Sequence, residues 1–337
     1  MLKIYSNLDW VKMYPKIPVA TLLYPFVGLY PEEFHDPRAP MANRFDDFIA
    51  NGSAFLAMAK KDEADLFVFP FEWYGLPRNS FGMQLLDAFF LDARACGKTA
   101  VLLAYGDDYV ELLEHPEVIV LQSNLERTKL KINHYAIPAF VEDLGRPFVA
   151  QRFGSWRLRL GLKRRPTISF CGFSGSAAER KEVIGRLRTS KAIKTRFILR
   201  ERYFGGAWDK EKNGFDFKRL QIIRKEYVDN LYAGDYVLCV RGYGNYSARF
   251  YESLCAGQIP LFVDTDCALP YSDIIDYEEF IIRITSSEIP FVGEFLADIN
   301  ASFTDEEFRW RKQRARQVWL NHLAPKGFFA SMPYLLQ

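Results

Sequence analysis

Short runs of apolar, β-branched residues alternate along this chain with longer amphipathic segments. This alternation is typical of βα units, in which helices join the parallel strands of a sheet. The predicted strands are 18–24, 64–70, 99–105, 117–123, 134–138, 167–172, 195–199, 235–242, 259–264 and 280–284. The predicted helices are 41–61, 81–96, 177–188, 217–234, 247–257 and a last helical stretch around 304–321.

The length of the chain, 337 residues, is more than a single compact core usually serves. A stretch rich in Gly, Pro and Arg, 139–166, separates the two sets of strands and is interpreted as the connection between domains. We therefore predict two Rossmann-like α/β domains, 1–150 and 151–320, with the C-terminal segment 321–337 packing back on the first domain. In open α/β sheets, ligands bind beyond the carboxyl ends of the strands, so a cleft between the domains is the expected site.

Charge and cysteine content exclude several classes of protein. With 44 basic and 42 acidic residues, the net charge is only +2, which argues against a general nucleic-acid-binding surface. The five cysteines form no CxxC pair and are odd in number, so neither a zinc site nor a disulfide framework is expected, and a reducing compartment fits best.

The segment 235–284 carries the clearest chemical signal in the chain. An apolar strand runs into a turn with two glycines, and a helix opens near Ser247. Glycines let the backbone approach a ligand, and the free N–H groups at a helix N-terminus favour anions. Arg241 and Arg249 can add bidentate hydrogen bonds to phosphate, while Glu252 can accept hydrogen bonds from ribose hydroxyls. The residues predicted to bind a nucleotide here are Arg241, Gly242, Gly244, Asn245, Ser247, Arg249 and Glu252.

Each part of this segment also has a simpler interpretation. A GxG turn after a strand is often only a tight turn, and Arg249 with Glu252 could be a surface ion pair at i,i+3 spacing. A second strand–turn–helix, FCGFSGSAAER (170–180), adds Gly172, Ser174 and Arg180, although Ser174 could be only a helix cap. Arg200, after the next strand, could line the same pocket.

Taken together, the 235–284 segment resembles the donor-binding half of the exostosin family. The shared pattern consists of Arg241, Gly242, Ser247, Arg249, Glu252, Ala256, Gly257, Ile259, Pro260, Leu269, Pro270, Tyr271 and Phe280. Weaker likenesses lie at 60–75 and at 134–140. Exostosins form glycosyltransferase family 47, whose members are inverting enzymes of the two-domain GT-B fold and mostly use UDP-sugars. The resemblance implies that Arg241 and Arg249 contact the donor diphosphate and that Glu252 contacts the ribose.

An inverting transfer needs a general base for the acceptor hydroxyl, and that base is expected in the first domain. The family's Gly-Arg-Asp-His element is not evident here, so the base must be sought among acids at strand ends. Asp107 and Glu72 rank first, because each follows a strongly apolar strand and has an aromatic neighbour. Asp107 could instead cap a helix. Trp73, Tyr74 and Tyr30 are predicted sugar-stacking residues of the acceptor site.

The triplet Asp264-Thr265-Asp266 spells the DxD that binds a divalent metal in GT-A enzymes. A match of three residues arises easily by chance, so we expect no metal and no cofactor besides the nucleotide-sugar co-substrate. The predicted partners are a UDP-sugar donor and an oligosaccharide or glycan acceptor. Two alternatives stay open: a fucosyltransferase-like enzyme using a GDP-sugar, and a non-catalytic protein that binds glycans or nucleotides on the same fold.

The N-terminus, MLKIYSNLDWVKMYPK, has no apolar core of a signal peptide, and no run reaches the roughly 18 apolar residues that span a bilayer. Golgi-resident sugar transferases carry a membrane anchor. We therefore expect a cytoplasmic, soluble protein of a microbe or virus, or a chain trimmed of its anchor.

Overall fold

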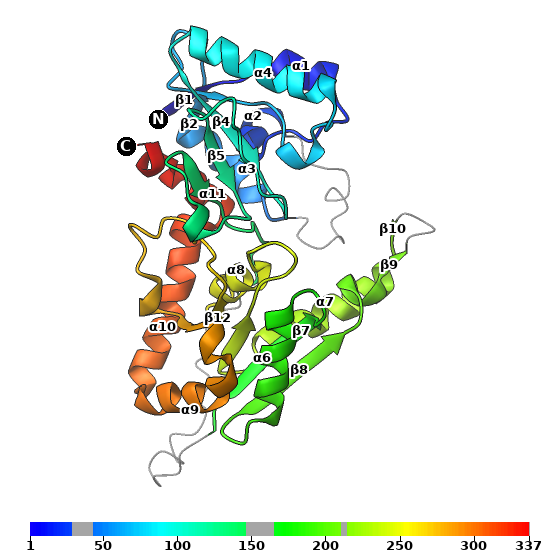
Figure 1. Ribbon diagram of the computed structural model, residues 1–337, viewed down its shortest axis with the longest axis vertical. Helices are drawn as coiled ribbons and strands as arrows, with labels where there is room; N and C mark the ends of the chain where they lie inside the picture. The colour runs from blue at the N-terminus through cyan, green and yellow to red at the C-terminus, as the bar shows by residue number, and fades with distance from the viewer. Residues whose placement is uncertain (29–42, 146–164, 210–213, 337) are drawn as a thin grey trace.

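Two parallel β-sheets organise the protein, as the computed structural model shows (Figure 1). The structure describes residues 1–28, 43–145, 165–209 and 214–336. The first sheet has the order β2-β1-β3-β4-β5-β6, with β1 Leu2–Tyr5, β2 Leu56–Met58, β3 Leu66–Val68, β4 Thr99–Ala104, β5 Ile119–Gln122 and β6 His134–Ala136. The second has the order β13-β12-β11-β7-β8, with β7 Thr167–Phe173, β8 Lys194–Arg200, β11 Tyr236–Cys239, β12 Ile259–Asp264 and β13 Ile282–Thr285. Every pairing within these two sheets is parallel.

Helices flank both sheets. Those of the first half are α1 Leu8–Met13, α2 Tyr24–Val27, α3 Asp46–Asn51 and α4 Ser80–Ala95. Those of the second half are α6 Ala178–Thr189, α7 Phe217–Leu231, α8 Ala248–Cys255, α9 Val292–Ser302, α10 Asp305–Val318 and α11 Pro325–Ser331. A short antiparallel hairpin, β9 Trp208–Asp209 and β10 Gly214–Phe215, extends beyond the second sheet next to the start of α7 (Figure 1). In the described part of the chain, no helix is long and apolar enough to cross a bilayer.

Local sequence explains the central elements. All six residues of β12 are buried, as expected for a parallel strand covered by helices on both faces. Helix α4 begins where the Asn79 side chain accepts a hydrogen bond from the Gly82 N–H. Its buried residues Leu86, Phe89, Phe90 and Ala93 follow the i, i+3, i+4, i+7 spacing of one helix face. The predicted fold class, two Rossmann-like parallel-sheet domains as in GT-B enzymes, is therefore confirmed.

The sheets fall within residues 2–136 and 167–285, and most of the predicted connection 139–166 lies outside the described residues. The domain limits 1–150, 151–320 and 321–337 themselves stay predictions.

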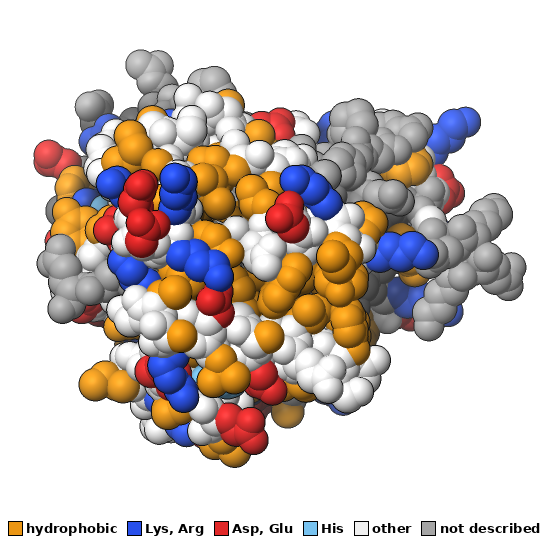
Figure 2. All heavy atoms as spheres, turned by 90° about the horizontal axis from the view of Figure 1, so that it is seen from above, with side chains coloured by type: hydrophobic (Ala, Val, Ile, Leu, Met, Phe, Trp, Pro, Cys, Tyr) orange, Lys and Arg blue, Asp and Glu red, His pale blue; other side chains and the backbone are white. Residues whose placement is uncertain are grey.

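Viewed from the top of Figure 1, the surface carries basic and acidic side chains interspersed with apolar ones rather than a broad field of one sign (Figure 2).

The last helices return from the second sheet to the first. Helix α11 lies beside α3 and the first sheet, near both chain ends (Figure 1). Its Phe329 ring stacks on Phe48 with centroids 4.7 Å apart and lies 5.5 Å from Phe140. The neighbouring Phe328 carbonyl accepts a hydrogen bond of 2.7 Å from the Tyr271 hydroxyl. One apolar core thus includes residues of both halves of the chain.

Two predicted elements of the first half are wrong. The run 18–24 is not a strand: Thr21–Leu23 forms a 3-10 turn, and only Val19 makes an isolated antiparallel bridge, to Phe71. Pro18 opens this run and Pro25 follows it, and proline supplies no N–H for a sheet ladder. Within the predicted helix 41–61, only α3 is α-helical. A 3-10 turn, Gly52–Ala54, follows it, and residues Leu56–Met58 form strand β2. Strands β1 and β2 and helix α9 were missed, the strands because three or four residues give too short a pattern.

Replacing Phe329 with Ala should lower the free energy of unfolding by about 3–5 kcal/mol, because the buried ring leaves a cavity among other rings. Urea unfolding followed by circular dichroism measures this change. Phe329 is 1% exposed, whereas Phe291 is 70% exposed, so Phe291→Ala is the matched control and should change stability by less than about 0.5 kcal/mol. Equal effects of the two variants would contradict the docking of α11.

Candidate functional site

The carboxyl ends of β7 and β11 and the first turn of α8 form a corner that favours anions. Strand β11 leads into the 241–247 loop, which is closed by a hydrogen bond of 3.2 Å from the Gly242 N–H to the Tyr246 carbonyl. Ser247 precedes α8, and its side chain makes no capping bond to the helix. The first N–H groups of α8 therefore remain available, at the positive end of the helix dipole. This corner can attract a phosphate.

Arg249, in the first turn of α8, reaches back across β7. Its guanidinium donates to the Cys171 carbonyl and lies over the Phe170 ring, 4.2 Å from the centroid. Gly172 has a φ of +153°, and an added Cβ there would lie 2.6 Å from Nη2 of Arg249. A side chain at position 172 would have to displace this guanidinium, so the two predicted residues Gly172 and Arg249 lie in contact.

Four polar atoms around this corner are buried without a hydrogen-bond partner among the described residues. They are Nε of Arg241, Nε of Arg249, Nδ2 of Asn245 and Oγ of Ser247. All four can donate a hydrogen bond, and none belongs to an acid. Buried donors without partners are costly in a folded protein, which makes an absent acceptor the natural explanation. The set fits a ligand rich in oxygen and negative charge.

Glu252 lies one turn further along α8 and is 8% exposed. Its carboxylate accepts a hydrogen bond from the Tyr227 hydroxyl and lies 3.7 Å from Nη1 of Arg224. Arg224 also pairs with Glu142, on the segment after β6. Burial raises the pKa of Tyr227 well above its ordinary value, and the charge of Glu252 adds to the shift. A carboxylate offers about four lone-pair positions, so Glu252 keeps capacity for a further donor.

The other predicted residues of the second domain surround this corner in different roles. Arg180 is buried and donates to the Phe173 and Val240 carbonyls, at 3.1 and 2.7 Å, which ties β7 to β11. Arg200 pairs with Glu226 at 2.8 Å, and Ser174 lies half-buried in the turn after β7. Arg180 therefore stabilises the corner by hydrogen bonds to two backbone carbonyls that line it.

Asp107 faces the 241–247 loop from the other sheet. It follows β4 and is exposed. A Cβ added to Gly244 would lie 2.7 Å from Oδ1 of Asp107, so the two loops are in direct contact. Asn124 joins them through hydrogen bonds to the Asp107 carbonyl and from the Asn245 N–H. The structure thus brings a predicted base and the predicted nucleotide-binding loop together, across the two domains.

Glu72 is placed differently. It is 1% exposed, and its Oε1 accepts hydrogen bonds from the Thr21 N–H at 2.9 Å and hydroxyl at 2.5 Å. Burial raises the pKa of the Glu72 carboxyl, although the bonds from Thr21 oppose this shift. The chain after β3 runs through the buried residues Pro70 and Phe71, so the next residue, Glu72, also lies below the surface. Its Oε2 is buried without a hydrogen-bond partner among the described residues, and the role of Glu72 as a base stays a prediction.

The predicted aromatic platform lies near Asp107. Trp73 is half-buried with the Arg78 guanidinium 4.2 Å above its ring, and Arg78 pairs with Asp108 at 2.7 Å. Tyr74 is 45% exposed. Tyr30 lies outside the described residues.

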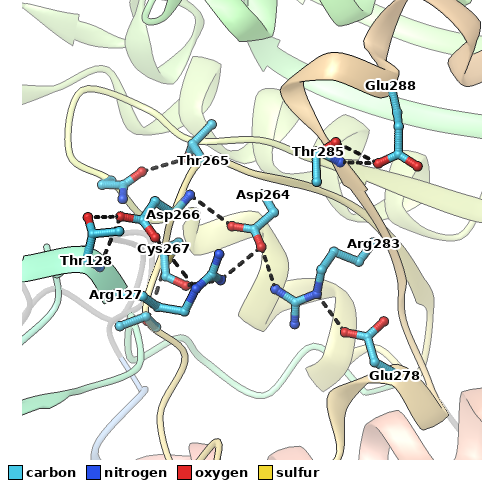
Figure 3. A network of polar contacts seen from close by, with 12 residues as sticks. Arg127, Thr128, Asp264, Thr265, Asp266, Cys267, Glu278, Arg283, Thr285 and Glu288 are labelled. Atoms are coloured by element: carbon cyan, nitrogen blue, oxygen red, sulfur yellow. Dashed lines mark hydrogen bonds and ion pairs between the residues drawn. The ribbon is translucent and has the colours of Figure 1, made fainter. Parts of the chain in front are cut away.

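The Asp-Thr-Asp triplet is part of an ion-pair network between the domains (Figure 3). Asp264 accepts hydrogen bonds from Arg127 of the first domain at 2.9 Å and from Arg283 of the second at 2.8 Å. Burial alone would raise the pKa of the Asp264 carboxyl, but these two arginines hold it below its ordinary value. Asp266, at a φ of +67°, accepts from the Thr128 N–H at 3.1 Å. Across the described residues, no three His, Cys, Asp or Glu side chains are grouped as a metal site.

Sequence reasoning missed Asn124, Arg127, Tyr227 and Arg283. Each contacts the site through a partner on another element, and a single sequence carries no signal for such a pairing.

Replacing Glu72 with Gln should flatten the pH dependence of stability. A carboxyl whose pKa is raised on folding stabilises the protein below its unfolded pKa, about 4.3, and this contribution is lost as pH rises through the folded pKa. The Tm of Glu72→Gln minus that of the wild type should therefore increase from pH 5 to pH 8. Differential scanning calorimetry measures it, with the exposed Glu63→Gln as control; a difference that falls with pH would contradict the buried carboxyl.

Comparisons with known proteins agree with the resemblance seen in the sequence. Residues 149–299, just under half of the chain, match the Exostosin GT47 domain. A probable glycosyltransferase of Arabidopsis thaliana is 29% identical over 92 residues, which are 27% of this chain and 18% of that protein. The probable glucuronosyltransferase GUT1 of Oryza sativa subsp. japonica is 27% identical over 92 residues, 27% of this chain and 22% of that protein.

The probable beta-1,4-xylosyltransferase IRX10 of Arabidopsis thaliana is 27% identical over 107 residues, 32% of this chain and 25% of that protein. The alignments thus span a quarter or less of the length of each of these three relatives. Among solved structures, a glycosyltransferase from Rickettsia africae aligns over 100% of this chain and 97% of its own, with a TM-score of 0.43 and 10% identity. The predicted resemblance is confirmed by the sequence matches: this chain is exostosin-like, and the match to the GT47 domain spans residues 149–299.

Proposed function

We propose that the protein is an inverting glycosyltransferase that moves a sugar from a UDP-sugar to a hydroxyl of a saccharide. The observation that carries this proposal is the group of buried, unpartnered hydrogen-bond donors in the 241–247 loop and at the start of α8, together with the contact of that loop with Asp107 of the first domain. An exostosin-like sequence in the same segment and relatives named as glycosyltransferases support it.

The second domain holds the nucleotide in this proposal. Arg241 and Arg249 bind the diphosphate with the N–H groups of α8, and Asn245 and Ser247 supply further hydrogen bonds to its oxygens. Glu252 binds the ribose with the lone pairs that Tyr227 and Arg224 leave available. As the bond to the sugar breaks, charge develops on the diphosphate, and donors held in place by the fold stabilise it without reorganisation.

The first domain holds the acceptor and the base. The Asp107 carboxylate takes the proton of the acceptor hydroxyl while its oxygen forms a bond to the anomeric carbon. On the opposite face of the sugar, the bond between that carbon and the diphosphate oxygen breaks, and UDP leaves with the electron pair. Trp73 and Tyr74 offer rings against which an acceptor sugar can stack.

The donor sugar and the need for metal are parts of the same proposal. Relatives named for glucuronosyl and xylosyl transfer make UDP-glucuronic acid and UDP-xylose the first donors to test. We assign no metal role to Asp264, because two arginines already neutralise its carboxylate.

Isothermal titration calorimetry with UDP tests the nucleotide site. Arg249→Ala should weaken UDP binding about 10- to 100-fold, as expected for the loss of a charge-assisted hydrogen bond. Arg186→Ala is the matched control, since Arg186 is an exposed arginine on α6 whose nearest acidic partner is 4.0 Å away, and its affinity should equal that of the wild type. EDTA in the buffer should leave the affinity unchanged.

Selective binding of GDP would favour the alternative that the protein uses a GDP-sugar rather than a UDP-sugar. Nucleotide binding without transfer from any donor would favour the non-catalytic alternative. Equal affinities of the two arginine variants would remove Arg249 from the site.

Gly172→Ala should weaken UDP binding about tenfold or more, because its methyl group would displace the Arg249 guanidinium and its φ is unfavourable for alanine. Gly185→Ala is the matched control: nothing lies within 4 Å of its added Cβ, in the interior of α6. This control should bind UDP normally and gain about 0.5–1 kcal/mol of stability. Calorimetry and thermal unfolding measure both; normal UDP binding by Gly172→Ala would argue against the proposed role of Arg249.

A further inference from the structure

The two sheets are joined at their carboxyl edges by a short antiparallel contact. The segment after β5, residues 124–128, runs against residues 266–268 after β12. The backbone bonds are Arg127 N–H to Asp266 carbonyl and Ala268 N–H to Leu125 carbonyl, both 2.9 Å. Leu125 is fully buried, so the segment is anchored on its inner side.

Asn124 is the first residue of this segment, and its amide bridges two loops that carry chemistry. Its Nδ2 donates to the Asp107 carbonyl at 2.6 Å, and its Oδ1 accepts from the Asn245 N–H at 2.7 Å. Asn245 is held a second time, from its own domain, by the Thr265 hydroxyl at 2.6 Å. The loop with Asp107 and the 241–247 loop, which also touch at Asp107 and Gly244, are therefore hydrogen-bonded to each other through the side chain of Asn124.

An amide suits this position for a chemical reason. The site needs one donor, toward a carbonyl, and one acceptor, toward an N–H, a few ångströms apart. A carboxylate at position 124 would have no proton to donate to the Asp107 carbonyl. Its negative charge would also lie near that of the Asp107 carboxylate. A lysine or arginine would have nothing to accept the Asn245 N–H.

We propose that Asn124 is a positioning residue for sugar transfer, which holds Asp107 at a fixed distance from the nucleotide-binding loop. The inference rests on the proposed function, because it assigns Asn124 an effect on the transfer step. The 241–247 loop keeps its own tether through Thr265, so removal of Asn124 releases mainly the Asp107 side. The turnover number then falls while binding of the nucleotide persists, since a displacement of about 1 Å can cost about 100-fold in rate.

The test compares Asn124→Ala and Asn124→Asp with the wild type and with Asn133→Ala. Asn133 is a matched control, since its Nδ2 also donates to a backbone carbonyl of the first domain, that of Pro116 at 2.9 Å. Release of UDP from a UDP-sugar in the presence of acceptor gives kcat and KM, and calorimetry gives the affinity for UDP. Thermal unfolding checks that each variant is folded.

Both Asn124 variants should lose about 10- to 100-fold in kcat, with the donor KM and the UDP affinity within about threefold of the wild type. Asn133→Ala should keep the wild-type kcat. Asn124→Asp separates the two bonds, because it can still accept from the Asn245 N–H but cannot donate to Asp107. Full activity of Asn124→Asp, or a loss confined to KM, would overturn the inference.

A merely structural role for Asn124 would lower Tm and leave the kcat of the folded enzyme unchanged, which also overturns the inference. Amide exchange over residues 105–110, without ligand, gives a further readout: faster exchange in Asn124→Ala than in Asn133→Ala is expected, and equal exchange contradicts it. A wild type that transfers no sugar refutes the proposed function and this inference together. An active wild type with an equally active Asn124→Ala refutes only the inference.

Discussion

The contact between the segment after β5 and the loop after β12 fixes how the two sheets face each other. Its centre is Asp264, whose carboxylate is shared by Arg127 from one domain and Arg283 from the other. Such a largely buried carboxylate is tolerated only while its partners remain, because an unpaired charge in this position is costly. Sliding or opening the domains here would separate Arg127 from Asp264 and break the backbone bonds beside them. The interface therefore favours one arrangement.

That arrangement brings loops of both domains together at one place. Parallel strands leave all their carboxyl-end loops at one edge, and here the edges of both sheets meet. The second domain contributes helix dipole, arginine and unpartnered donors, whereas the first contributes an exposed carboxylate, Asp107. The positive, anion-binding surface and the negative carboxylate of Asp107 therefore come from different domains.

Sequence patterns predicted the sheets because buried parallel strands such as β4 and β12 appear as continuous apolar runs. They also predicted the 241–247 loop, because an apolar strand runs there into a turn with two glycines and a helix follows. They could not place Glu72, whose enclosure depends on Thr21, fifty-one residues away in sequence. Nor could they find Asn124, because an asparagine after a strand is ordinary until its partners are known. Short strands such as β2 are set by tertiary pairing rather than by local periodicity.

A second connection restrains the domains on the far side of α8. Arg224 pairs with Glu142 of the segment after β6 and approaches Glu252, while Arg316 of α10 pairs with Asp143 at 2.7 Å. Helix α8 is thus held from the first domain at its start, through Asn124 and the 241–247 loop, and near its end. Residues fixed at both ends lose little freedom when a ligand arrives, so binding energy is not consumed in ordering them. Glu252, placed between these two connections, is oriented by Tyr227 and Arg224 of α7, and Arg224 in turn pairs with Glu142 across the domain interface.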